Sequence, residues 1–341
     1  MRRFNTFQDF NYTILLTCAG GGLLKYNAFY LKQNQNKFIK VIGVDIKKNI
    51  NSEHFDRFYK VPKPENKNFI KRINYIVKKD NISLIIPTSD EEILKFSKFK
   101  NFFQRKGVDI ACENRRNVEI FTDKYKTYEF LKRSKIDKQD YYLIKNFKQL
   151  KSKLNIFREF VLKPLSGRGG RGVYIIKKHV KKNLYLNFGR EITTDLQKFQ
   201  KFFMKKIKYY PLILTPKLKE PVFDVDFLAS KGKLEKIVMR KRLVSEEPNS
   251  GHKFCSVPGN IKNKFKKICK KLKLNGLYDS DLMRGKKNSL KIIEINPRPS
   301  GSVSVTCAAG LNLLSDLIDL KIGKKISEKK KILKSQIKLN S

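Results

Sequence analysis

The sequence contains no tryptophan, three histidines and five cysteines in 341 residues. No pair of cysteines has CxxC spacing, so neither a zinc ribbon nor a disulfide framework is indicated, and a reducing, cytoplasmic setting fits best. No apolar run approaches the roughly 18 residues that a membrane-spanning helix requires, so we expect no membrane partner. These absences favour a globular cytoplasmic protein with two or three domains.

Acidic residues are also scarce, because 31 Asp and Glu stand against 76 Lys and Arg, which gives a formal net charge of +45. Such a charge attracts polyanions such as nucleic acid. The lysines nevertheless occur in almost every block of ten residues rather than in one arm, which favours a compositional bias spread over solvated faces. No basic cluster interleaved with aromatic residues stands out, so nucleic acid is a disfavoured partner.

The first third of the sequence predicts an open α/β domain. A β-type run at 12–17 ends in the glycine turn 20–22, a helix is expected at 23–31, and a second strand at 41–45 ends in an acid. The glycines lack the spacing of a dinucleotide-binding fingerprint. A structural turn is therefore favoured over a cofactor site.

Polar residues follow the next predicted strand of this domain. Helical apolar spacing predicts a helix at 69–79, and a third strand is expected at 84–87. Asp90 lies just beyond that strand, where ligands of open α/β folds bind. The same polar run can instead cap a helix predicted at 92–103, so both interpretations stay open.

A lysine opens another predicted helix. Thr122 or Asp123 is a natural N-cap, which puts Lys124 in the first helical turn. The helix dipole disfavours a cation there, and a bound anion would explain it. Chance placement on the surface is the alternative.

A glycine-rich loop follows a strand that carries one lysine. Lys163 lies in a strand predicted at 160–164, and the loop 165–172 with four glycines leads into a strand at 173–176. Backbone N–H groups of such a loop can approach phosphate oxygens closely. We therefore interpret this hairpin as a phosphate-binding flap in preference to a flexible loop without a ligand.

Two arginines lie at the end of a second predicted hairpin. Residues 222–229 alternate with period two, and 234–239 return antiparallel after a glycine turn. Arg240 and Arg242 project from one face of the returning strand. They either hold a phosphate or a substrate carboxylate, or they are surface charge.

The stretch 290–302 reads LKIIEINPRPSGS and predicts a buried strand that ends at two prolines. Glu294 puts a carboxylate into the apolar run, which is costly unless a bound cation or another group compensates it. Asn296 projects from the same face and Arg298 stands at the strand mouth. In a hairpin with the preceding strand, Asp281 can come opposite Glu294. These groups suit a magnesium–phosphate complex, with an ordinary strand and a satisfied glutamate as the alternative.

The combination of Lys163, the GRGGRG loop and the Glu-x-Asn-Pro-Arg stretch at 294–298 resembles the ATP-grasp superfamily. Within it, the resemblance points to carboxylate–amine ligases like the carbamoyl-phosphate synthase large subunit, and it covers about residues 12–320. The resemblance implies an α/β and α+β fold, with a Rossmann-like pre-ATP-grasp domain that contains an open parallel sheet at 1–115. A two-lobed ATP-grasp domain would follow at 116–325, with a small lid lobe at about 150–210 and a C-terminal lobe at about 211–325. Residues 326–341 would form a basic tail.

The resemblance also implies roles for single residues. Lys163 and Arg298 would be catalytic, and Mg²⁺, with Mn²⁺ as the alternative, would be held by Asp281, Glu294 and Asn296. The ATP-binding set it implies is Lys124, Lys163, Gly167, Arg168, Gly169, Gly170, Gly172, Lys217, Leu218 and Glu220. Our own candidates for the substrate walls are Asp90, Arg240, Arg242, Ser300, Gly301 and Ser302.

The sequence departs from the family pattern at two places. The hinge that receives adenine and ribose usually carries acids where Thr215, Pro216 and Val222 stand here, so Glu220 is the candidate substitute. Position 281 is more often Gln or Glu than Asp. Only one ATP-grasp unit is present, so the chain is not carbamoyl-phosphate synthase itself.

The expected activity is an ATP-dependent, ADP-producing ligation that joins a small-molecule carboxylate to an amine or a similar nucleophile through an acyl phosphate. A homodimer is compatible with this interpretation. The alternatives are a nucleotide-binding protein without turnover and a basic nucleic-acid-binding protein. The substrates cannot be read from the sequence.

Overall fold

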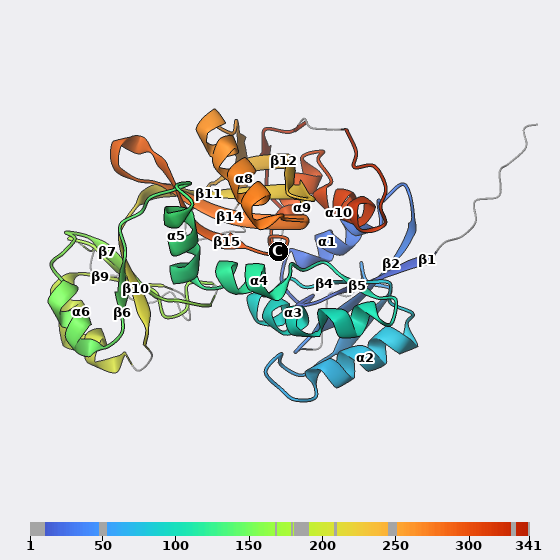
Figure 1. Cartoon of the computed structure of the whole chain (residues 1–341), viewed down its shortest axis with the longest axis horizontal. Helices are drawn as coiled ribbons and strands as arrows, with labels where there is room; N and C mark the ends of the chain where they lie inside the picture. Colours follow the sequence, from blue (N-terminus) through green and yellow to red (C-terminus); the bar gives the residue numbers. More distant parts are fainter. Residues whose placement is uncertain are drawn as a thin grey trace, which may run out of the picture. The chain divides into compact units, whose positions relative to one another are not determined.

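The computed structural model describes residues 11–47, 53–167, 169–178, 180, 191–207, 210–244, 251–328 and 332–339. The chain forms two compact units (Figure 1). The first unit comprises Met1–Val118, Pro221–Ser280 and Asn296–Ser341, and the second comprises Glu119–Glu220 and Asp281–Ile295. Each unit is therefore built from segments that are far apart in the sequence.

The first unit opens with a parallel five-stranded sheet in the order β3-β2-β1-β4-β5. Its strands are β1 (Asn11–Leu16), β2 (Phe38–Asp45), β3 (Arg57–Lys60), β4 (Leu84–Ile86) and β5 (Asp109–Ile110). Helices α1 (Leu24–Leu31), α2 (Phe69–Lys79), α3 (Asp90–Gln104) and α4 (Arg115–Phe121) connect or follow them. The strand order reverses between β1 and β4, which is where open α/β sheets form a crevice at their carboxyl ends.

The two faces of this sheet belong to different hydrophobic clusters. Leu15 and Ile85 pack with the apolar residues of α2 and α3. Ile14 and Leu84, which point to the opposite face, pack with α1 and with α9 (Val303–Ala308) and α10 (Leu313–Lys321) near the end of the chain. The alternation of side chains along each strand is what divides the residues between the two faces.

The second unit contains a five-stranded sheet in the order β6-β10-β7-β8-β9. Its strands are β6 (Tyr142–Ile144), β7 (Phe160–Pro164), β8 (Tyr174–Ile176), β9 (Ile192–Thr194) and β10 (Leu212–Pro216). The helical segments are α5 (Lys124–Arg133), α6 (Phe147–Lys153), α7 (Leu196–Lys198), η1 (Phe199–Phe203) and η2 (Met204–Lys206). Strands β7 and β8 are antiparallel, which confirms the hairpin predicted around the glycine loop.

A six-stranded sheet follows in the order β15-β14-β11-β12-β13-β16. Its elements are β11 (Lys219–Ser230), β12 (Lys233–Arg242), β13 (His252–Cys255), β14 (Gly276–Arg284), β15 (Leu290–Asn296) and β16 (Gln336–Ile337), with α8 (Gly259–Leu272) before β14 and η3 (Lys286–Asn288) before β15. The predicted antiparallel pairing of β11 with β12 is confirmed.

Two predictions about local structure need correction. Helix α3 begins at Asp90 rather than at residue 92, because the Ser89 side chain accepts a hydrogen bond from the Glu92 N–H and caps the helix. Strand β15 forms as predicted but is not buried throughout, since Ile293 is half-buried and the Glu294 side chain is 30% exposed. The burial cost that the sequence suggests for Glu294 is therefore only partly incurred.

Candidate active site

Two lysines of the second unit lie near the carboxylates of the β14–β15 hairpin. Lys163 is buried on β7, and its burial lowers its pKa to about 8, while Glu294 and Asp281 act in the opposite direction by favouring the charged form. The Lys124 Nζ lies 3.6 Å from a Glu294 oxygen and donates a hydrogen bond of 3.0 Å to the Gly167 carbonyl. The structure thus brings together four of the predicted site residues: Lys124, Lys163, Asp281 and Glu294.

The start of α5 explains the position of Lys124. The Asp123 side chain caps the helix by accepting from the Lys126 N–H at 3.0 Å, which confirms one of the two predicted N-caps. The Lys124 N–H donates to the Leu165 carbonyl at 2.8 Å, which ties the helix start to the beginning of the glycine loop. Glu294 and the loop carbonyl therefore compensate the cation that the helix dipole disfavours.

The glycine loop adopts a backbone that side chains disfavour. Gly167, Gly169, Gly170 and Gly172 all have positive φ, at 112°, 67°, 73° and 72°. This left-handed region costs glycine little, and it turns the chain tightly between β7 and β8. Arg168, which the family resemblance assigned to ATP, lies outside the described residues.

Of the predicted hinge residues, Lys217 and Leu218 lie between β10 and β11, and Glu220 lies at the start of β11. The Lys217 Nζ donates to the Leu218 carbonyl at 3.4 Å and lies 3.8 Å from Glu220, whose side chain is 45% exposed. The Lys217 N–H donates to the Glu159 carbonyl at 3.1 Å. The hinge therefore presents an exposed carboxylate next to its lysine, and its contact with ribose stays a prediction.

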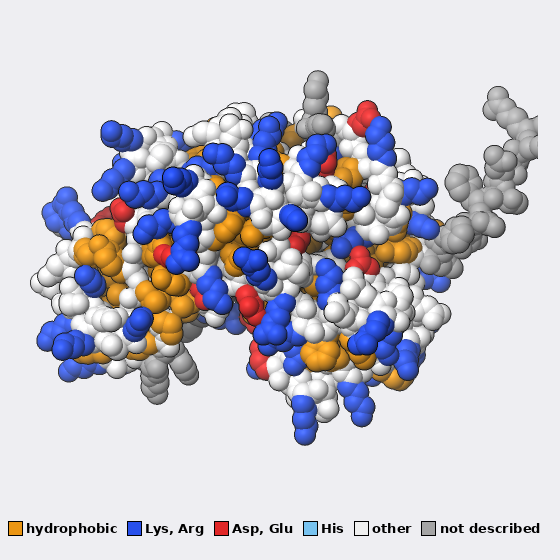
Figure 2. All heavy atoms as spheres, viewed as in Figure 1, with side chains coloured by type: hydrophobic (Ala, Val, Ile, Leu, Met, Phe, Trp, Pro, Cys, Tyr) orange, Lys and Arg blue, Asp and Glu red, His pale blue; other side chains and the backbone are white. Residues whose placement is uncertain are grey.

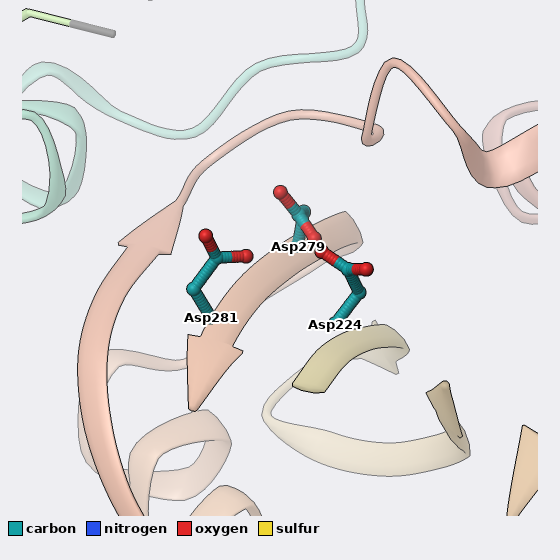
Figure 3. Close-up of side chains that lie close together, drawn as sticks. All are labelled: Asp224, Asp279 and Asp281. Atoms are coloured by element: carbon teal, nitrogen blue, oxygen red, sulfur yellow. The ribbon is translucent and has the colours of Figure 1, made fainter. Parts of the chain in front are cut away.

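Three aspartates gather on neighbouring strands (Figure 3). Asp279 and Asp281 are two residues apart on β14, so they share a face, and Asp224 lies on the adjacent strand β11. One oxygen of each carboxylate lies within 4.8 Å of the other two. Such oxygen ligands suit a hard divalent cation.

Asp279 is the least compensated of these carboxylates. Its Oδ2 accepts a hydrogen bond of 3.0 Å from the Asn296 amide, and no hydrogen-bond partner for its buried Oδ1 is found among the described residues. Burial, with Asp226 and Asp224 nearby, raises the pKa of Asp279 to about 7. A cation bound here would lower that pKa.

The arginines of β12 pair with the carboxylates of β11. Arg240 is fully buried, 2.9 Å from Asp226, and donates to the Ser302 carbonyl and hydroxyl at 3.1 and 3.2 Å. Arg242 donates to Asp224 from Nε, at 3.0 and 3.1 Å to its two carboxylate oxygens, and from Nη2 at 2.5 Å. Both arginines are thus internal ion pairs, and the interpretation as surface charge is wrong.

The predicted substrate walls split into two groups. The Arg298 Nε donates to Asp90 at 2.8 Å, and both side chains are largely buried. The Ser300 hydroxyl lies 3.4 Å from Arg240, so both serines of the wall, Ser300 and Ser302, contact that guanidinium. Gly301 between them is exposed.

Several polar residues at these sites were not predicted. Asp224 and Asp226 alternate along β11, so their spacing alone could have indicated an acidic face, as the spacing of Asp279 and Asp281 does for β14. His252, which is buried, binds the Asp224 carboxylate through Nε2 at 2.9 Å. Burial lowers the pKa of His252, although Asp224 acts in the opposite direction.

A second unpredicted group lies at the carboxyl ends of β1 and β4. The Thr17 hydroxyl donates to buried Glu92 at 2.6 Å, and Ser89 donates to the same oxygen at 2.8 Å. The Thr88 hydroxyl donates to the Thr17 carbonyl at 2.6 Å. No motif signals this network, because it depends on two strands that lie side by side only in the fold.

Family models match both ends of the chain. Residues 14–111 match the model described as PylC-like, N-terminal domain, and residues 208–340 match the model described as ATP-grasp in the biosynthetic pathway with Ter operon. An uncharacterized protein of Methanocaldococcus jannaschii is 24% identical over 222 residues, which are 64% of this chain and 51% of that protein. The chain thus matches about half the length of this curated relative.

Solved structures share the fold at low sequence identity. N5-carboxyaminoimidazole synthetase from Staphylococcus aureus, complexed with ADP, has a TM-score of 0.71 at 14% identity, over 96% of this chain and 82% of that one. Biotin carboxylase from Campylobacter jejuni has a TM-score of 0.67 at 15% identity, over 93% and 72% of the two chains. L-amino acid ligase from Bacillus licheniformis has a TM-score of 0.66 at 13% identity, over 91% and 74%.

The fold and the two matching family models together indicate one class of protein, in which a parallel N-terminal sheet is followed by an ATP-grasp fold. The match of residues 208–340 to an ATP-grasp family model confirms the resemblance that the lysine, the glycine loop and the Glu-x-Asn-Pro-Arg stretch indicate. In the part of the chain that the structure describes, no helix is both long and apolar enough to span a membrane.

Proposed function

We propose that the protein is an ATP-dependent ligase that activates a small-molecule carboxylate as an acyl phosphate and joins it to an amine or a similar nucleophile. Two features support this: the family match, and a fold shared with a synthetase solved with ADP and with an amino acid ligase. The observation that carries the proposal is the buried Lys163 ammonium, which lies near the Glu294 and Asp281 carboxylates in the second unit.

The residues present fit a magnesium ion. Asp281, Glu294 and Asn296 offer carboxylate and amide oxygens, which are the ligands that Mg²⁺ prefers. The Asn296 amide nitrogen is occupied by Asp279, which leaves its amide oxygen outside that bond. Burial, with Asp226 and Asp224 nearby, raises the pKa of Asp279 to about 7, and a cation bound close to its carboxylate would compensate that burial. When bound, Mg²⁺ would neutralise phosphate charge; Mn²⁺ is the alternative.

The first chemical step transfers the γ-phosphoryl group of ATP. A carboxylate oxygen of the substrate attacks the γ-phosphorus, the bond to the bridging oxygen of ADP breaks, and an acyl phosphate forms. Lys163 and Lys124 would neutralise the phosphate oxygens under the glycine loop, and Arg298 would stabilise the transferred group. Asp90, which Arg298 contacts at 2.8 Å, would orient that guanidinium.

The second step forms the new bond. The amine attacks the acyl carbon, phosphate leaves with the electron pair of the C–O bond, and the ammonium proton passes to a base. Arg240 and Arg242 are already paired with carboxylates, so they would shape the substrate wall rather than supply a free cation. Asp90, Ser300, Gly301 and Ser302 remain the other candidates for that wall.

Replacement of Glu294 by Ala tests the proposal. We expect ADP release, measured with a substrate pair found by screening carboxylates against amines, to fall by about 100-fold or more, because a carboxylate that would hold the magnesium ion is lost. Glu235→Ala is the matched control, since Glu235 is paired with Lys233 at 3.2 Å on β12. Unchanged turnover in Glu294→Ala would rule out its assigned role.

The alternative is a nucleotide-binding protein without turnover. It predicts that the wild-type protein binds MgADP but releases no ADP from ATP with any substrate pair. Measuring binding and turnover on the same preparation separates the two functions.

A further inference from the structure

Tyr128, on α5 of the second unit, lies near both Lys124 and Lys163. It follows Lys124 by one helical turn on α5, so both residues face the same side of the helix. Its side chain is buried, and a buried tyrosine hydroxyl needs hydrogen-bond partners.

The Tyr128 hydroxyl makes two hydrogen bonds that join different parts of the predicted site. It donates to the Ile293 carbonyl at 2.8 Å, and this carbonyl belongs to the residue before Glu294. It accepts from the Lys163 Nζ at 3.1 Å. One hydroxyl therefore connects the β15 strand that carries Glu294 to the lysine on β7.

Lys163 depends on this contact for its position. Among the described residues, the Tyr128 hydroxyl is the hydrogen-bond acceptor that the structure gives its ammonium, which also lies 5.5 Å from the centre of the Tyr128 ring. Glu294 and Asp281 attract the ammonium through their charge but do not fix its direction, because Coulomb attraction is less directional than a hydrogen bond.

We propose that Tyr128 is a positioning residue. Its hydroxyl holds the Lys163 ammonium in a fixed place beside the strand that carries Glu294, so that the lysine meets the nucleotide phosphates. The inference rests on the proposed function and goes beyond it, because it gives Tyr128 a role that acts through Lys163. A purely structural role, in which Tyr128 only packs α5 against β15, is the competing explanation.

Tyr128→Phe tests the proposal because it keeps the ring and removes the hydroxyl. We expect MgADP to bind about tenfold more weakly and the KM for ATP to rise, as is typical when a hydrogen bond to a charged group is lost. The decisive measurement is a cycle with Lys163→Ala: if Tyr128 acts through Lys163, adding Tyr128→Phe to that variant causes no further loss of MgADP affinity.

Tyr141→Phe is the matched control. Its ring packs on Tyr128 with centroids 5.4 Å apart, and its hydroxyl bonds Glu129 rather than Lys163, so its loss should leave MgADP affinity unchanged. If Tyr128→Phe does not fold, Tyr128→His replaces it, because a ring nitrogen can accept from the lysine, and positioning then predicts affinity closer to the wild type than that of Lys163→Ala.

The possible results distinguish the positioning role of Tyr128 from the proposed ligase function. Wild-type affinity in Tyr128→Phe, or losses that multiply in the double variant, would overturn the positioning role while leaving the ligase proposal intact. Unchanged affinity in Lys163→Ala would overturn it as well. Failure of the wild-type protein to bind MgADP or to release ADP in the substrate screen would refute the proposed function, and the inference with it.

Discussion

At the residue scale, Lys163 shows how burial prepares a side chain for binding. Burial lowers its pKa to about 8, while Glu294 and Asp281 limit the fall. A lysine with such a pKa is partly deprotonated in mildly alkaline solution, unlike an exposed lysine. Phosphate oxygens would replace the solvation that the ammonium has lost.

The lowered pKa predicts a pH dependence of nucleotide binding. Phosphates favour the charged lysine, so MgADP affinity should be constant below about pH 8 and fall by about tenfold per pH unit above it, until the pKa of the complex is reached. Isothermal titration calorimetry between about pH 7 and about pH 10, a range that brackets this pKa, would measure the decline. Lys163→Ala is the control, and an equally steep decline in that variant would show that another group titrates.

The ion-pair partners of Arg240 and Arg242 could not be predicted from the sequence. The register places Arg240 opposite Asp224 and Asp226 opposite Val238, yet Arg240 pairs with Asp226. Arg242 pairs with Asp224, so both guanidinium groups reach diagonally by two residues. Spacing in the sequence indicates which face of the strand each charged side chain occupies. The arginine side chain is long enough to reach either of two neighbouring carboxylates, so spacing does not determine its partner.

At the scale of elements, the surroundings of the loop between β7 and β8 explain where this loop needs glycine. A Cβ added to Gly170, whose φ is 73°, would lie 2.9 Å from the Glu191 backbone nitrogen and would collide with the Glu191 side chain. A Cβ at Gly169, whose φ is 67°, meets no atom within 4 Å. The two positions share the same backbone strain and differ in their surroundings.

This difference predicts unequal effects of two alanine substitutions. Gly169→Ala should cost about 1 kcal/mol of backbone strain and leave MgADP affinity nearly unchanged. Gly170→Ala must in addition displace Glu191 and the start of β9, and should weaken MgADP binding by about tenfold or more, a change of about 1.4 kcal/mol. Binding and thermal melting of both variants would check this, and equal effects would contradict the role of Glu191.

Regular elements were predicted well where one periodicity dominates. The helix at 69–79 has the predicted bounds, because its buried residues recur at helical spacing. Helix α8 was not predicted, although Ile261, Phe265 and Ile268 also have helical spacing and are buried. The Tyr128 hydroxyl and the Thr17–Glu92 bond could not be predicted, since they connect residues 165 and 75 positions apart in the chain.

At the scale of the whole molecule, the lysines and arginines behind the net charge of +45 occur along the whole sequence. Figure 2 shows Lys and Arg side chains scattered across the visible face, with Asp and Glu between them. Scattered charges act at a distance but offer no shaped site for a particular base sequence.

The charge distribution predicts weak, unspecific binding to nucleic acid. Duplex DNA of any sequence should bind at about 10 mM salt, where the Debye length is about 30 Å, and should be released as salt rises above about 0.15 M. Fluorescence anisotropy with two unrelated duplexes would measure this. High affinity for one duplex in about 0.5 M salt would revive the alternative of a nucleic-acid-binding protein.

The order of the segments has a consequence for synthesis on the ribosome. The chain changes unit after Val118, Glu220, Ser280 and Ile295, so the second unit is complete only when a nascent chain has reached Ile295, and the first also needs the segment Asn296–Ser341. The last insertion, Asp281–Ile295, is also the piece that brings Asp281 and Glu294. Under the proposed function, capture of magnesium nucleotide would therefore begin only after this last insertion has been made, and products that stop before Asp281 would lack both carboxylates.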